Sequence, residues 1–171
     1  MPLSKIDSDS LNSGVPTRAQ LPAGSVLQVV QVVASTQQTT TSNTYTDMTG
    51  MSVSITPTSA SSKILAIVNV NGVYVGQATT GLQTRLVRGA TNIAFGGSYA
   101  AYQAAAGDQD IGSVVMQILD SPATTSATTY KVQFRSKTGG KEVRVNLNDS
   151  GNTQLNDEST NSVITLMEIA A

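Results

Sequence analysis

The sequence predicts an all-β protein, a jelly-roll-like antiparallel β-sandwich preceded by an extended N-terminal arm. Three observations favour this fold class. About nine or ten segments of strand character recur at intervals of roughly eight to twelve residues, turn-forming residues separate them, and no stretch shows the period of a helix. The chain has 171 residues, which is the size of one domain. The order of the strands in the sheets cannot be read from the sequence without knowing which strands pair, so other Greek-key sandwiches remain as alternatives to the jelly roll.

Residues 1–24 form the predicted arm. They are rich in Ser, Asp, Asn, Pro and Gly, and their isolated Leu, Ile and Val residues are too sparse to build a periodic face. Such a segment is either a loose terminus or an arm that docks on a partner, and the scattered apolar side chains favour docking. The sandwich is expected to occupy residues 25–171.

Five single strands are predicted from local patterns. Residues 25–34 are a β-branched run, expected to be the first core strand, and residues 51–56 alternate apolar and hydroxyl side chains. Residues 63–70 are almost continuously apolar, which predicts a central strand buried on both faces. Residues 111–119 have strand character again, and residues 162–169 are expected to hold the C-terminus in a sheet.

Two hairpins are predicted. Residues 82–87 and 91–95 flank a short turn in which Gly89 supplies the required backbone geometry. Residues 130–135 and 142–147 both alternate apolar and polar side chains around a Thr-Gly-Gly turn, which predicts the second hairpin.

Composition excludes several function classes. The chain has no His, Cys or Trp, so disulfides, zinc sites of Cys and His, Cys nucleophiles and catalytic triads with a His base are absent. Ten Lys plus Arg and eleven Asp plus Glu give a net charge of −1, which argues against a dedicated nucleic-acid binder. No apolar run is long enough to span a membrane, and the first residues do not resemble a signal peptide.

Carboxylates are the remaining candidates for acid–base chemistry or metal binding. Asp108 with Asp110, and Asp157 with Glu158, lie in predicted loops. The Asp108–Asp110 spacing occurs in calcium loops, but the further oxygen ligands of such loops are missing, so a solvated turn is favoured. We expect no enzymatic activity, no catalytic or metal site and no cofactor.

Basic residues gather in one part of the chain. Half of all Lys and Arg residues fall within the second predicted hairpin, which would form a positive ribbon from Lys131, Arg135, Lys137, Lys141 and Arg144. This ribbon either meets an acidic partner or protects a solvated sheet edge, and edge protection is favoured.

The tyrosines offer a second candidate for binding. They could stack on sugars, although tyrosines on sheet faces are common for packing reasons alone; they are Tyr45, Tyr74, Tyr99, Tyr102 and Tyr130.

Several segments resemble structural proteins of tailed bacteriophages. They are residues 22–31 (PAGSVLQVVQ), 52–65 (SVSITPTSASSKIL), 86–89 (LVRG), 119–123 (LDSPA), 130–134 (YKVQF) and 164–171 (ITLMEIAA). The resemblance implies a β-sandwich module of a phage fibre head or of a capsid cement (decoration) protein, a group in which trimers are frequent. These are strand-and-turn motifs and imply no catalytic residues.

Length favours the decoration protein within this resemblance. Only about two dozen residues precede the sandwich, and they span at most some 80 Å, which leaves little room for the shaft of a fibre. The expected function is therefore to bind the major capsid protein on the outer capsid surface as a homotrimer and stabilise the shell. The expected location is the virion, after synthesis in the host cytoplasm, with no nucleic-acid or membrane partner.

The arm carries the predicted capsid contacts. They are Leu3, Ile6 and Leu11 as apolar anchors, with Lys5 and Arg18 as polar contacts. The alternative is a tail-fibre or head-fibre tip that binds a host surface glycan or receptor through exposed tyrosines and loops such as residues 36–46.

Overall fold

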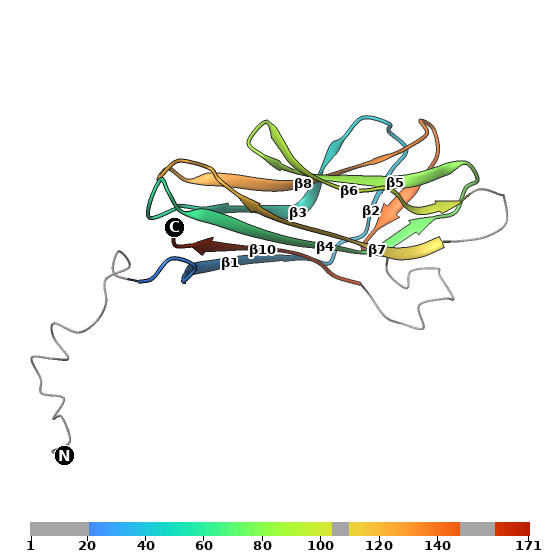
Figure 1. Cartoon of the computed structure of the whole chain (residues 1–171). Coiled ribbons are helices and arrows are strands. Elements are labelled where there is room, and N and C mark those ends of the chain that lie inside the picture. Colours follow the sequence, from blue (N-terminus) through green and yellow to red (C-terminus); the bar gives the residue numbers. More distant parts are fainter. Residues whose placement is uncertain (1–20, 104–109, 148–159) are drawn as a thin grey trace, which may run out of the picture.

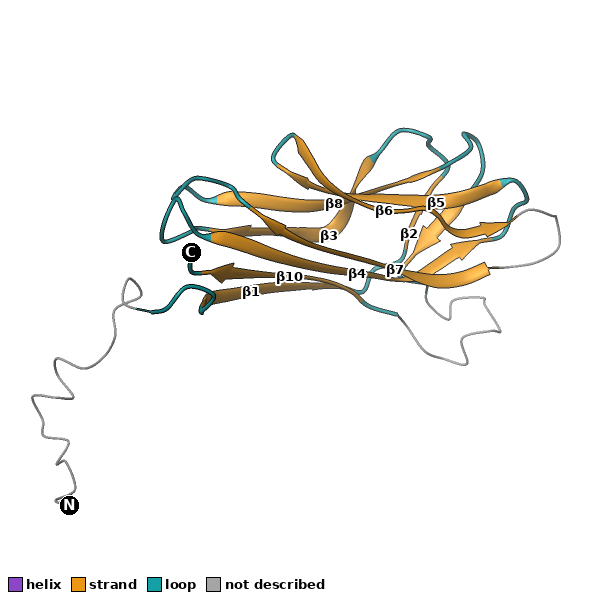
Figure 2. Cartoon of the chain, viewed as in Figure 1, coloured by secondary structure: helices purple, strands orange, loops and turns teal. Residues whose placement is uncertain are grey.

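Two antiparallel sheets lie face to face in the computed structural model, which describes residues 21–103, 110–147 and 160–171 (Figure 1). Every regular element among these residues is a strand (Figure 2). The strands are β1 (Val26–Ala34), β2 (Gln38–Thr40), β3 (Thr46–Ile55), β4 (Lys63–Val75), β5 (Thr80–Arg88), β6 (Thr91–Gln103), β7 (Asp110–Asp120), β8 (Thr128–Ser136), β9 (Val143–Val145) and β10 (Ser162–Ile169). Among the described residues, no helix is long and apolar enough to cross a membrane.

The strand order is that of a jelly roll. The large sheet runs β1-β10-β4, with β7 on the other edge of β4 and with β9 and β2 extending the sheet, and the small sheet runs β3-β8-β5-β6. The antiparallel pairs β1–β10, β3–β8, β4–β7 and β5–β6 are nested in sequence and alternate between the two sheets. The predicted jelly-roll-like antiparallel sandwich is confirmed. The predicted arm lies outside the described residues except for residues 21–24.

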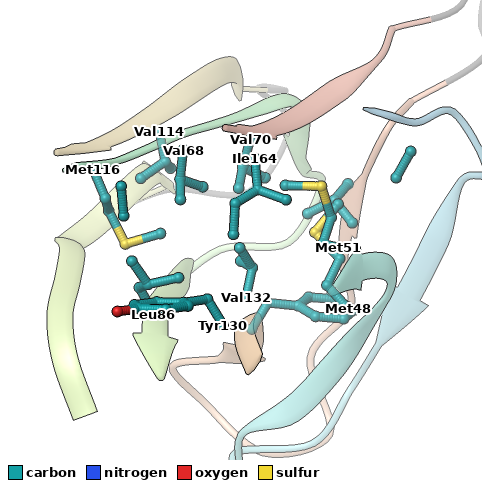
Figure 3. Close-up of a cluster of buried hydrophobic side chains, with 14 of the residues drawn as sticks. Met48, Met51, Val68, Val70, Leu86, Val114, Met116, Tyr130, Val132 and Ile164 are labelled. Atoms are coloured by element: carbon teal, nitrogen blue, oxygen red, sulfur yellow. The ribbon is translucent and has the colours of Figure 1, made fainter. Parts of the chain in front are cut away.

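The core lies between the sheets. Along β4 the buried residues Ile64, Ala66, Val68 and Val70 alternate with more exposed ones, as the two-residue period of a strand requires. Figure 3 shows that side chains from both sheets interdigitate, among them Met48, Met51, Val68, Val70, Leu86, Val114, Met116, Tyr130, Val132 and Ile164.

The first predicted hairpin is confirmed. Strands β5 and β6 pair around Gly89 and Ala90, and Gly89 has a φ of +56°, which glycine adopts without strain. The single strands at 111–119 and 162–169 are also confirmed, as β7 and β10.

The second predicted hairpin is wrong. Strand β8 pairs with β3 and β5 in the small sheet, whereas the short strand β9 pairs with β2 and β4 in the large sheet. The connection crosses between the sheets, and its amides Ser136 N and Gly140 N donate to the carbonyls of Ser42 and Thr41. Alternation places Val143 and Val145 in the core but does not specify which strand they pair with.

The prediction for residues 63–70 holds in part. Strand β4 is central, but only its inner face is fully buried, and its outer residues, such as Leu65 and Ile67, remain partly exposed. The strand also extends to Val75 through an irregularity between Val70 and Val73, where Gly72 has a φ of +56°.

The start of the described chain lies beside its end. Gly24 N donates to Ala170 O at 2.8 Å, and Ala170 N donates to Ser25 O at 2.9 Å. The segment that would join the arm to the sandwich therefore lies next to the C-terminal strand.

Candidate interaction surfaces

The central part of the outer face of the large sheet is largely apolar and carries no charge, and Lys63 of β4 and Arg144 of β9 lie at its margins. Strand register aligns its outward side chains in three rows across β1, β10, β4 and β7, and we call these residues the apolar face. The rows are Val29, Met167, Leu65 and Leu119; Gln31, Thr165, Ile67 and Gln117; and Val33, Val163, Asn69 and Val115.

The most exposed members of the apolar face lie on its two edge strands. Val29 and Val33 on β1 are 53 % and 55 % exposed, and Val115 and Leu119 on β7 are 64 % and 55 % exposed. Strand spacing gives the apolar face a footprint of about 400 Å², roughly half of one partner's share of a standard interface. Eight of its twelve residues are apolar, and the four polar ones are Gln31, Asn69, Gln117 and Thr165. Sandwich sheets usually present polar side chains to water, so this surface is suited to contact another protein.

The outer face of the small sheet is polar and charged. One row across its four strands consists of Asp47, Gln133, Arg85 and Phe95. The apolar and the polar surfaces therefore lie on opposite sides of the sandwich (Figure 1).

Two arginines stack on one tyrosine on this polar face. The guanidinium carbons of Arg85 and Arg135 lie 4.2 Å and 4.4 Å from the centre of the Tyr45 ring. Arg85 Nε donates to Gln133 Oε1 at 2.7 Å, and Arg135 Nε donates to Gln83 Oε1 at 2.8 Å. We call Arg85, Tyr45 and Arg135 the Arg–Tyr–Arg cluster; its glutamine partners fix the orientation of both guanidinium planes.

The acid in the same cross-strand row as Arg85 is engaged by other groups. Asp47 accepts hydrogen bonds from Gln133 Nε2 at 2.6 Å and Lys131 Nζ at 2.9 Å, and these two interactions hold the pKa of Asp47 below its usual range. Among the described residues, no carboxylate forms an ion pair with Arg85 or Arg135.

The predicted positive ribbon is divided between two sheets. Lys131 and Arg135 lie on the outer face of the small sheet, whereas Arg144 lies on β9 in the large sheet, pairs with Glu142 at 2.6 Å and stacks on Tyr74. Lys141 donates to the carbonyl of Ala78. The ribbon does not form, because β8 and β9 are not a hairpin.

Tyr130 does not serve as a sugar platform, because it lies in the core. Its hydroxyl donates to Asp120 Oδ2 at 2.7 Å, and Arg88 Nη1 donates to the same oxygen at 2.6 Å. Burial, with the Asp120 hydrogen bond, raises the pKa of Tyr130. This group joins β5 and β8 of the small sheet to β7 of the large sheet and is structural. The side chains of Tyr99 and Tyr102 lie outside the described residues.

The remaining sequence-predicted site residues are not placed. The arm contacts Leu3, Lys5, Ile6, Leu11 and Arg18 lie outside the described residues. The same holds for Asp108, Asp157 and Glu158, and for the side chain of Asp110. Within the described ranges, no three His, Cys, Asp or Glu residues gather in a group that could hold a metal ion.

A small cavity lies where the chain enters the sandwich. It has a volume of about 230 Å³ and is lined by Leu21 and Leu27, by hydroxyl side chains of the 58–62 turn and by the last two residues. None of its lining side chains is titratable, so the cavity itself offers no acid–base pair.

The fold and its surfaces define a jelly-roll sandwich with one apolar and one charged outer face. No protein-family model matches the chain, and no curated protein matches it. Among solved structures, the chain is similar to the infectious bursal disease virus Gt strain structure, with 12 % identity and a TM-score of 0.39 over 84 % of this chain and 38 % of that chain. It is also similar to the infectious bursal disease virus Gx strain structure, with 13 % identity and a TM-score of 0.31 over 84 % of this chain and 36 % of that chain. The chain thus spans less than two fifths of the length of either of those chains.

Proposed function

We propose that the protein is a virion structural protein, a capsid decoration protein that trimerises through the apolar face and binds the major capsid protein through its arm. The observation that carries this proposal is the apolar face, because it gives the sandwich an uncharged surface suited to protein contact. The resemblance of its strand-and-turn segments to tailed-phage structural proteins supports the virion as the location. The protein acts by binding, without catalysis.

The apolar face fits a second copy of this chain. It carries no charged side chain, so identical copies meet without like-charge repulsion. In a trimer, the half of the face built by β1 and β10 would pack against the half built by β4 and β7 of the next copy. In the proposed trimer, these two half-faces form a heterologous contact that repeats around a threefold axis.

Trimerisation would multiply the effect of the arm. Threefold symmetry would place the three arms at the same end of the trimer, each beside the C-terminal strand with which residues 24 and 25 hydrogen-bond. Linked arms gain avidity over a single arm, and a protein that binds the assembled shell but not its free subunits stabilises the shell by mass action.

The oligomeric state tests the interface. Light scattering on the full chain at roughly 100 µM should give about three times the chain mass of 17.7 kDa. Leu119→Lys on the apolar face should give a folded monomer, because it places a charge in the contact. Ser54→Lys, on an exposed position of the small sheet, should remain trimeric. A monomeric wild type, or a trimeric Leu119→Lys variant, contradicts the interface.

Electron cryo-microscopy of virions made with and without the protein tests the location. Density as knobs on the capsid shell supports decoration, and density confined to the tail contradicts it. Deletion of residues 1–21 should leave a folded trimer that no longer binds capsids. Retained capsid binding would show that the arm is not the anchor.

A fibre tip that binds a host surface glycan is the second candidate. The observation that favours it is the Arg–Tyr–Arg cluster, since Tyr45 lies at the end of the 36–46 segment between two cationic side chains. Density at the tail in the same experiment would support this candidate.

A further inference from the structure

We infer that the outer face of the small sheet carries a binding site for a carboxylated carbohydrate, in which Arg85 and Arg135 bind the carboxylate and Phe95 supports the sugar ring. This inference does not rest on the decoration function, because it concerns the opposite side of the sandwich from the apolar face.

The first argument is the arrangement of the charges. Both guanidinium groups lie over one ring, so their like charges are within about 9 Å of each other and repel. The described residues place no carboxylate in ion-pair contact with either group. A carboxylate that accepts from the remaining Nη groups of the two arginines would relieve this repulsion and form charge-assisted hydrogen bonds.

The second argument is preorganisation. The Nε bonds to Gln133 and Gln83, together with stacking on Tyr45, hold both guanidinium groups in place before any ligand arrives. Arg135 Nη1 also donates to the Asn43 carbonyl at 3.0 Å. Arginine side chains lose much rotamer freedom on binding, so groups that are already fixed bind an anion with a smaller entropic penalty.

The third argument is the exposed aromatic ring beside the cluster. Phe95 is 66 % exposed and is the direct cross-strand partner of Arg85, so both side chains lie on the same face. A sugar ring has apolar C–H faces that can pack on an aromatic ring, whereas its carboxylate requires a cation. A cation pair next to an exposed ring thus favours a sugar acid over a simple inorganic anion.

Asp47 and Lys131 are further charged residues on this face. Asp47 would repel an anion, but its carboxylate is already bound by Lys131 and Gln133. With Arg85 and Arg135 included, the face keeps a net positive charge. In the proposed trimer the site stays open to solvent, because the apolar faces turn toward one another on the far side.

Binding of the full chain to polygalacturonate, measured by calorimetry, tests the inference. Wild type should bind polygalacturonate but not its fully methyl-esterified form, which has the same backbone without the charge. The Arg85→Gln/Arg135→Gln double variant should lose at least about tenfold in affinity, and Phe95→Ala should lose several-fold. Tyr45→Phe should bind nearly as wild type, because it retains the stacking ring.

Two single variants distinguish binding at the proposed site from non-specific attraction to positive charge. Arg144→Gln removes one positive charge from the large sheet and should leave binding unchanged, whereas Arg85→Gln alone should weaken it. An equal loss in Arg144→Gln and Arg85→Gln would overturn the inference, as would a wild type that binds dextran sulfate but not polygalacturonate. Thermal unfolding of each variant confirms that the fold is retained.

Discussion

Glu168 is a buried charge that the surrounding hydrogen bonds keep ionised. Its carboxylate accepts hydrogen bonds from Thr58 N and Gln28 Nε2, both at 2.6 Å, and from Thr58 Oγ1 at 2.7 Å. Burial raises the pKa of Glu168, but these hydrogen bonds outweigh burial and hold the pKa below its usual value. The residue therefore links β10 to β1 and to the turn before β4.

Replacing this carboxylate should destabilise the protein in a pH-dependent way. Glu168→Gln should lower the free energy of unfolding by about 1–3 kcal/mol at pH 7, because one amide group cannot accept all three hydrogen bonds. The folded pKa lies below the unfolded value of about 4.3, so this contribution is complete above that pH and declines as pH falls through the folded pKa. Urea unfolding of both proteins between pH 7 and pH 3 should show the difference shrinking in acid. A difference that stays constant with pH would contradict the role of the charge.

Gly72 determines the geometry of the longest large-sheet strand. It lies at the irregularity in β4 with a φ of +56°, and a Cβ at this position would lie 2.5 Å from Leu147 N and would also collide with Thr160 Oγ1. Because Gly72 has no side chain, the segment after β9 can pack directly against β4, where Leu147 N donates to the Gly72 carbonyl.

Gly72→Ala and Gly89→Ala together test whether the space around Gly72 matters for stability, beyond its backbone conformation. Both glycines have a φ of +56°, but a Cβ on Gly89 meets nothing within 4 Å. Gly89→Ala should lower the free energy of unfolding by about 1 kcal/mol, because alanine is strained at this φ. Gly72→Ala should lower it by about 2–4 kcal/mol, because backbone atoms must also move to make room for the Cβ. Chemical denaturation measures both losses, and equal losses would show that the contact with Leu147 does not matter.

At the scale of the whole molecule, the two outer faces should respond to salt in opposite ways. The apolar face has no charged side chain, so raising NaCl from about 0.05 M to 1 M should leave the trimer intact or strengthen it. Polygalacturonate binding on the charged face should weaken over the same range, because it is an interaction between opposite charges at the protein surface, which salt screens. Sedimentation and calorimetry across the salt series measure both. A trimer that dissociates in salt would indicate an electrostatic interface, contrary to the proposal.

Local patterns predicted most of the strands correctly for a physical reason. Alternation along residues 162–169 and the glycine turn between β5 and β6 depend on neighbours in sequence, and both are seen in the fold. The error at residues 130–147 concerns pairing between strands, which depends on contacts distant in sequence. The Arg–Tyr–Arg cluster escaped prediction for the same reason, because its three residues come from separate parts of the chain.

The sequence by itself determined the all-β class, the alternating core positions of most strands, and the absence of His and Cys chemistry, because these follow from residue types and their spacing. The tertiary structure decided which face of each strand the second sheet covers. The apolar run in β4 predicted burial on both faces, yet only the inner one is covered, and the outer one joins β1, β10 and β7 in the apolar face. Strand period assigns side chains to one side or the other, but only the packing of the two sheets decides which side meets the core and which remains on the surface.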